Sequence, residues 1–104
     1  MHNNYNIIMD MIKFEWDENK NRTNQQKHGI SFDEAKTVFY DENAILFDDP
    51  EHSREEERFL IIGVTTNEKI CIVSHCYKDN DKKIRLISAR KATKSERKTY
   101  LENW

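Results

Sequence analysis

The chain has 104 residues, of which 35% are charged and 37% are apolar, and its formal net charge is -2. This length fits one domain with one modest core, and two glycines and one proline argue against a low-complexity chain. There is no long apolar run, and the N-terminus lacks a basic region followed by an apolar stretch. We therefore expect no membrane span and no signal peptide, and we predict a cytoplasmic protein.

The first elements in chain order are a polar extension, a strand and a helix. Residues 1–10 are rich in Asn and are expected to form a flexible extension in front of a domain at 11–104. The alternation of "IKFEW" predicts a short strand at 12–16. The polar segment 17–28 predicts an exposed helix with its first residue as the N-cap, and Gly29 ends it in a left-handed conformation.

A second helix and a short strand follow. Ser31 and Glu34 have the spacing of a capping box, and the apolar residues after them repeat at helical intervals, so we predict a helix over 31–40. The apolar stretch "AILF" predicts a strand at 44–47, and an acidic segment at 51–57 comes after it.

The last part of the chain reads as three strands and a helix. The apolar runs predict strands at 58–66, 70–78 and 84–91, of which the first two form a hairpin. Thr93 and Glu96 form a second capping box, which opens a helix over 93–103. Cys71 and Cys76 lie five positions apart in one strand, on opposite faces, so they cannot pair, which is consistent with a reducing compartment.

The predicted order of elements is therefore β-α-α-β-β-β-β-α. This order is typical of a small single-domain α+β protein with an antiparallel sheet. We expect the helices to pack on one face of the sheet and the other face to be free for function.

Charge is unevenly distributed along the chain. Residues 41–57 contain eight acids and one base, whereas residues 82–98 contain eight bases and one acid. Such clustering can select a partner even when the net charge is small. The alternative is that both segments are ordinary solvated surfaces.

Three segments together resemble the BrnT toxins of bacterial type II toxin–antitoxin systems. They read "KFEWDENKNRTNQQKHGISFDEA", "DDPEHSREEERFLIIG" and "IRLISARKATKSERKTY", and they occur in the same order over about 12–100. The resemblance implies a RelE-like ribonuclease fold and cleavage of RNA that inhibits translation. It also implies neutralisation by a BrnA-like antitoxin with a ribbon-helix-helix domain, in a 2:2 complex that binds operator DNA through the antitoxin.

Cleaving RNA through its 2′-OH without a metal requires a base, a cation to hold the phosphate and an acid for the leaving oxygen. His suits proton transfer near neutral pH, and the planar guanidinium of Arg can bind two phosphate oxygens. The candidates for catalysis are Arg58, Arg85, Arg90, His52 and His75, and those for RNA binding are Ser88, Lys91, Lys94 and Arg97.

Each arginine candidate also has a structural interpretation. Arg85 and Arg90 lie on opposite faces of a regular strand, so a strand end, a twist or a bulge is needed to bring both to one cleft. Either can instead pair with the acidic segment 51–57, and Arg58 can form an edge salt bridge of little energetic value. The acids at 55–57 can act as the base or can repel RNA.

The remaining candidates also have structural alternatives. His52 lies in a loop and can stabilise a turn, whereas His75 lies mid-strand and is more typical of a core histidine. Ser88 can fill space between strands rather than bind phosphate. There is no C-x-x-C or H-x-x-x-H pattern, so we expect neither a metal site nor a cofactor.

A second function fits the same sequence. The chain can be a catalytically weak binding module that mainly holds an antitoxin and contributes to operon autoregulation. Its anchor residues would then be exposed aromatic side chains at Phe39, Tyr40, Phe47 or Trp104. Direct DNA binding is a weaker interpretation, because no helix rich in Arg, Asn and Gln reads as a recognition helix.

Overall fold

The computed structural model describes residues 12–103 and contains one five-stranded sheet. The strand order across the sheet is β1-β5-β4-β3-β2. The strands are β1 (Lys13–Glu15), β2 (Ile45–Asp48), β3 (Phe59–Val64), β4 (Ile70–Lys78) and β5 (Lys83–Lys91). The predicted extension at 1–10 and the aromatic residue Trp104 lie outside the described residues.

The sheet is mixed, so the prediction of a purely antiparallel sheet was wrong. β2 to β5 form antiparallel neighbours, but β1 runs parallel to β5, with Phe14 beside Ile84. The segments after residue 58 read as hairpins, which fix antiparallel pairing locally. No turn joins β1 to β5, and the sequence pattern carries no signal for the direction of such a distant pair.

The helical elements are α2 (Glu18–His28), α3 (Phe32–Ala35), α4 (Lys94–Glu102) and the 3-10 helices η1 (Lys36–Tyr40) and η2 (Pro50–His52). The order of the predicted elements is confirmed, but the predicted helix 31–40 is split into α3 and η1.

Local capping explains where these helices begin and end. The Asp17 carboxylate accepts a hydrogen bond from the Asn19 backbone N–H at 2.8 Å, and Gly29 ends α2 at φ 71°. Thr93 and the third residue of α4 form the predicted capping box. Only half of the other box forms, because the Glu34 carboxylate instead accepts a hydrogen bond from the Thr65 hydroxyl at 2.9 Å.

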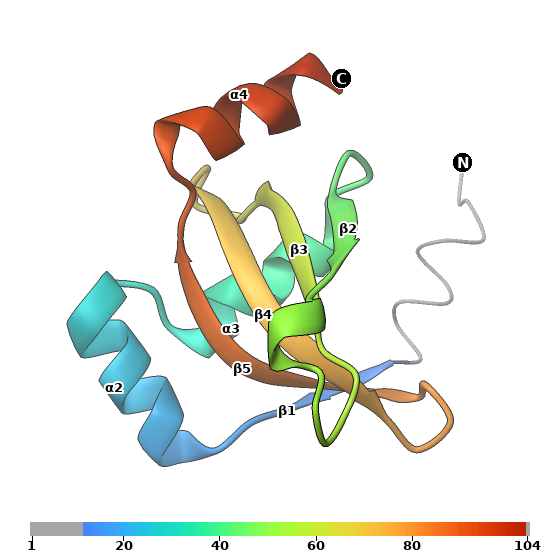
Figure 1. Cartoon of the computed structure of the whole chain (residues 1–104). Coiled ribbons are helices and arrows are strands. Elements are labelled where there is room, and N and C mark those ends of the chain that lie inside the picture. The colour runs from blue at the N-terminus through green and yellow to red at the C-terminus, as the bar shows by residue number, and fades with distance from the viewer. Residues whose placement is uncertain (1–11, 104) are drawn as a thin grey trace, which may run out of the picture.

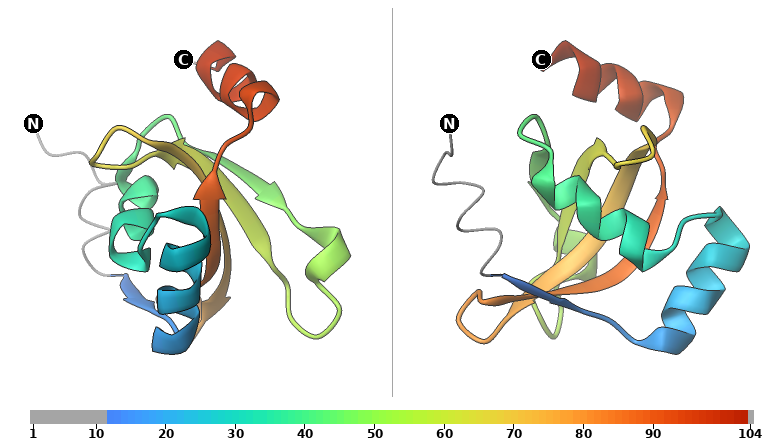
Figure 2. Two further views of the ribbon diagram at one scale, coloured as in Figure 1. Left: turned by 90° about the vertical axis from the view of Figure 1, so that its left-hand side faces the viewer. Right: turned by 180° about the vertical axis from the view of Figure 1, so that it is seen from behind.

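The main core lies between the sheet and the segment α2–α3–η1. It contains Ile30, Phe32, Ala35, Val38, Phe39, Ile61, Cys71, Val73, Ile84, Leu86 and Ala89. α4 does not join this layer; it lies at one end of the sheet, apart from α2 and α3 (Figures 1 and 2). Its buried Tyr100 packs with Ile62 and Ile72 on the opposite face, so the prediction that all helices cover one face was wrong.

A bulge in β5 decides which side chains share a face. Ser74 pairs with Ser88 but the next residue of β4, His75, pairs with Leu86, so the register skips Ile87. Leu86 and Ala89 can therefore both face the main core, where each is 1% exposed. Within the described part of the chain, no helix is long and apolar enough to cross a membrane.

Candidate functional site

The sheet face opposite α2 and α3, here called the open face, carries the candidates from β5. Because of the bulge, Arg85, Ser88 and Arg90 all lie on this face, whereas a regular strand would separate the two arginines. The bulge that the sequence analysis named as one way to bring Arg85 and Arg90 to the same side of the strand is therefore present. The open face is apolar near α4, around Ile62 and Ile72, and charged at the other end.

The charged end of the open face is centred on Cys76. This residue pairs directly with Arg85 of β5, and Arg58 stands just before β3, whose first residue pairs with His75. The charges of Arg58 and Arg85 both act on the Cys76 thiol. The structure therefore brings Arg58 and Arg85 together, one on each side of this residue.

Carboxylates accompany these two arginines. Arg85 Nε lies 3.3 Å from Glu15 Oε2 of β1, and Arg58 Nε lies 3.7 Å from Glu56 Oε1. Glu56 makes its shorter contact with Lys78 Nζ, at 2.7 Å, and this hydrogen bond lowers the pKa of the Glu56 carboxyl. The predicted alternative, pairing of Arg85 and Arg90 with segment 51–57, is not found among the described ion pairs. Glu56 of that segment pairs with Arg58 and Lys78 instead.

Cys76 itself is unsuited to act as a nucleophile. Burial raises the pKa of the Cys76 thiol, and the neighbouring Glu56 carboxylate raises it further. The thiol is therefore neutral near pH 7, and the thiolate is the reactive form of cysteine. The second cysteine, Cys71, is also free and buried, in the main core.

Arg58 also borders a hollow beside the acidic segment. The hollow has a volume of about 540 Å³ and is lined by Glu51, His52, Arg54, Glu55, Glu56 and Arg58. The Arg58 Nε atom is buried and has no hydrogen-bond partner among the described residues. A buried donor of this kind is costly unless a partner completes it.

His52 is held by a neighbouring carboxylate on the same turn. Its Nδ1 atom lies 3.1 Å from both carboxylate oxygens of Asp49. The Asp49 side chain is only 12% exposed, whereas the His52 side chain is 61% exposed. Because Nδ1–H donates to Asp49, the outer nitrogen Nε2 is the one available for proton exchange.

Arg90 belongs to a different part of the open face. Its guanidinium donates to both carboxylate oxygens of Glu96, at 2.8 and 3.0 Å, and so joins the end of β5 to the first turn of α4. Glu96 Oε1 also accepts from the Thr93 N–H. The Arg90 hydrogen bond is the main reason why the pKa of the Glu96 carboxyl falls to about 2.

His75 lies in the core, between aromatic rings. It packs edge-on against Phe39 and Tyr77, with ring centroids 4.8 and 5.3 Å apart. Its Nδ1 atom lies 3.1 Å from the Val73 carbonyl oxygen and its Nε2 atom 3.3 Å from the Tyr77 hydroxyl. Burial lowers the pKa of the His75 imidazole to about 4. The structure therefore places it away from the charged cluster and in its neutral form.

The four residues predicted to bind RNA do not form one group. Ser88 is exposed on the open face opposite Ser74, while Lys91 is exposed at the end of β5. Lys94 and Arg97 are exposed on α4 and border a shallow surface beside Leu101.

Sequence reasoning missed the residues that organise the arginines and the histidine. Asp49 precedes His52 by three residues on a turn, and this spacing was a usable signal for a carboxylate–imidazole pair. Cys76 and Lys78 gave no such signal, because their proximity to Arg58 depends on strand register. Among residues 12–103, no three His, Cys, Asp or Glu side chains are grouped closely enough to hold a metal ion.

Comparisons with known proteins identify the family of the chain. The chain is similar to the crystal structure of the Brucella abortus ribonuclease toxin, BrnT, with a TM-score of 0.61 and 26% sequence identity. The likeness covers 80% of this chain and 99% of that one. No curated protein matches the sequence. The family model of the ribonuclease toxin BrnT, of type II toxin–antitoxin systems, matches residues 16–96. The chain therefore belongs to the BrnT family of ribonuclease toxins.

Proposed function

We propose that the protein is an endoribonuclease toxin that cleaves RNA by attack of the 2′-OH on the adjacent phosphate, with Arg58 at the centre of its site. One observation carries the proposal: Arg58 borders the hollow that contains His52 and also lies across Cys76 from Arg85. Arg58 thus lies near both a proton-transfer group, His52, and a second cation for the phosphate, Arg85. Family membership supports RNA as the target and a protein antitoxin as the partner.

The two arginines stabilise the phosphate as negative charge develops on it. The Arg58 Nε donor is buried and has no hydrogen-bond partner within residues 12–103, since the Glu56 Oε1 atom of its ion pair lies 3.7 Å away. A phosphate oxygen would complete its hydrogen bonding. The Arg85 side chain is 46% exposed and pairs with Glu15 through one 3.3 Å contact, which leaves other guanidinium donors for a ligand. The charge-assisted hydrogen bonds from a guanidinium to phosphate are strong and directional.

His52 supplies the proton transfer. Asp49 orients the imidazole through Nδ1, in the way that a carboxylate orients a catalytic histidine, and Nε2 exchanges the proton with RNA. Glu56 is a poor general base because its hydrogen bond with Lys78 lowers the pKa of its carboxyl. We assign His75 and Arg90 structural roles, in the core and at the start of α4, because of the hydrogen bonds that their side chains make there.

The proposal includes the finer features that the resemblance implies. These are metal independence, inhibition of translation, a RelE-like fold, and neutralisation by a BrnA-like ribbon-helix-helix antitoxin in a 2:2 complex that binds operator DNA. A catalytic metal site typically takes a grouped set of three protein ligands. The cations and the histidine at Arg58 provide a route that needs no such set.

Growth arrest on induced expression tests the assignment of the arginines. We expect arrest by the wild type but not by Arg58→Ala or Arg85→Ala, at equal levels of soluble protein. Arg22→Ala on α2 is the matched control, because it removes one arginine that lies outside the hollow at Arg58. Equal arrest by all four proteins would remove Arg58 and Arg85 from the site.

A specific feature also favours the second function, antitoxin binding. An apolar cleft of about 390 Å³ lies between α4 and the open face, lined by Phe47, Asp48, Leu60, Ile62, Ile72, Glu96 and Thr99. Phe47 and Tyr40 are each 41% exposed and remain candidates for anchors. Phe39 is in the main core, so the prediction that it is an exposed anchor was wrong. If Phe47→Ala lost antitoxin affinity while neither the wild type nor any variant cleaved RNA, the chain would be better described as a binding module.

A further inference from the structure

We propose that a groove between α2 and β5, separate from the site at Arg58, binds the phosphodiester backbone of the RNA substrate. The proposal rests on the proposed ribonuclease function and adds a second phosphate-binding site to it. The groove has a volume of about 320 Å³. It is lined by Asn19, Lys20, Thr23, Asn24, Lys27, His28, Ile87 and Ser88.

The floor of the groove is fixed by a buried asparagine. Asn24 donates to the carbonyl oxygens of Ile30 and Ala89, both at 2.9 Å, and its Oδ1 accepts from the Ala89 N–H at 3.0 Å. The three residues of β1 pair with Lys83, Ile84 and Arg85 at the start of β5. Beyond these residues, α2 lies beside β5 and contacts it. A single side chain thereby ties the helix to the strand, and the groove is formed before any ligand binds.

The basic side chains of the groove differ from those of the open face in their partners. Lys20, Lys27 and His28 form no salt bridge within residues 12–103, and no acid lines the groove. By contrast, Arg85 and Arg90 each have a carboxylate partner. Positive charge in the groove is therefore not compensated by an ion pair within residues 12–103, and the groove attracts an anion without first breaking one.

The polar groups of the groove suit a sugar–phosphate chain. Thr23 and Ser88 carry hydroxyls, and Asn19 carries an amide, so all three can bond phosphate or ribose oxygens. Ile87 is the only large apolar side chain in the lining. A protein segment would need apolar anchors to bind tightly, and the apolar cleft beside α4 offers them instead.

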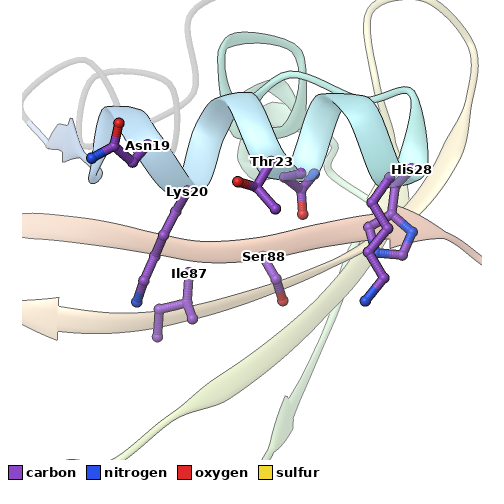
Figure 3. Close-up of a pocket in the computed structure, with 8 residues that line it drawn as sticks. Asn19, Lys20, Thr23, His28, Ile87 and Ser88 are labelled. Atoms are coloured by element: carbon purple, nitrogen blue, oxygen red, sulfur yellow. The ribbon is translucent and has the colours of Figure 1, made fainter.

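The bulge makes the groove continuous with the open face. Lys20 extends past β5 toward Ile87, on the side to which Ser88 also points (Figure 3). Ser88 also lies on the open face. Its pair with Ser74 is two pairs along the ladder from the pair of Cys76 with Arg85. A single strand of RNA whose scissile phosphate lies between Arg58 and Arg85 can therefore cross β5 at Ser88 and continue into the groove.

Binding of an uncleavable RNA analogue tests the proposal. The probe is a fluorescent 2′-O-methyl oligonucleotide of about 12 nucleotides, which cannot react because it lacks the attacking 2′-OH. Its affinity for the full chain is measured by anisotropy at several salt concentrations. The groove variant is Lys20→Gln with Lys27→Gln. The matched control is Lys36→Gln with Lys69→Gln, which removes the same charge from two lysines that pair with the α3 acids Asp33 and Glu34.

We expect the groove variant to bind about tenfold more weakly and the control to bind like the wild type. Because each single-strand phosphate contact adds about 0.7 to the salt slope, loss of two contacts lowers the slope by about 1.4. Equal loss in both variants, or no loss in either, would overturn the groove while leaving the proposed function intact. No binding by the wild type would instead refute the ribonuclease proposal. If the groove variant lost affinity for a poly-glutamate peptide but bound RNA like the wild type, the groove would bind a protein and the RNA site would be overturned.

Discussion

Arg90 and Glu96 form a two-point ion pair between the end of β5 and the first turn of α4, with distances of 2.8 and 3.0 Å. The same carboxylate completes the capping box of α4. Arg90, which the sequence analysis named as a candidate for catalysis, therefore helps to attach α4 to β5. Its partner Glu96 lines the apolar cleft beside α4, which contains no residue of the Arg58 hollow.

Arg90→Ala and Glu96→Gln are expected to destabilise the protein by similar amounts. The pair is charge-assisted but partly exposed, so we expect a loss of about 1 kcal/mol in the free energy of unfolding for either change. Urea unfolding measures the loss, and RNA cleavage by the folded fraction should persist in both variants. Cleavage abolished in folded Arg90→Ala but kept in Glu96→Gln would show that Arg90 contacts RNA.

The pH dependence of stability reports the same pair. The pKa of the Glu96 carboxyl is lowered to about 2 in the folded state, from a reference value of 4.5. Its contribution is therefore complete above about pH 4.5 and is lost as pH falls toward 2. We expect the difference in melting temperature between wild type and Glu96→Gln to shrink over this interval. A constant difference from pH 6 to about pH 2.5 would contradict the pairing.

His75 gives a second pH dependence in a different window. Burial lowers the pKa of its imidazole to about 4, from a reference value of 6.5, so the unfolded state binds the proton more readily. The wild type should lose stability as pH falls from about 6.5 to 4. The His75→Phe variant should lose less stability over that pH range, and it should still cleave RNA. A folded His75→Phe protein without cleavage would return His75 to the catalytic site.

Gly63→Ala is expected to disturb the packing of η1 on β3. A Cβ atom at Gly63 would stand 2.8 Å from Val38 Cγ1 and 3.0 Å from Asp41 Oδ2. Asp41 in turn accepts hydrogen bonds from the Val64 N–H and the Tyr100 hydroxyl, so the crowding also reaches the anchor of α4. We expect a loss of about 1–3 kcal/mol, measured by urea unfolding. Unchanged stability would mean that η1 can shift away from β3 without cost and so accept the added methyl group.

Local patterns in the sequence predicted the elements well, and distant pairings poorly. The caps at Asp17, Gly29 and Thr93 were readable because each involves residues within one turn. The parallel pairing of β1 and the transfer of α4 to the other sheet face were not readable, because both depend on contacts between distant segments. The split of 31–40 into α3 and η1 also left no mark in the spacing of apolar residues.

The candidate site shows the same limit. The arginines and His52 were identified as chemical groups from the sequence, but their grouping depends on the skipped Ile87 and on strand register. Strict alternation separated Arg85 from Arg90, and only the bulge places both on the open face. The same alternation could not show that Arg58 lies across Cys76 from Arg85, since that arrangement depends on how β3, β4 and β5 pair.

Analysis of the RNA ends produced by the purified chain in EDTA is the most direct test of cleavage by the 2′-OH. We expect 2′,3′-cyclic phosphate and 5′-hydroxyl ends, with cleavage lost in Arg58→Ala and reduced about 100-fold or more in His52→Ala. The pH–rate profile then shows whether His52 acts as base or acid, since a base must be deprotonated and an acid protonated. Intact RNA with folded wild-type protein, or 3′-hydroxyl and 5′-phosphate ends, would contradict the proposed mechanism.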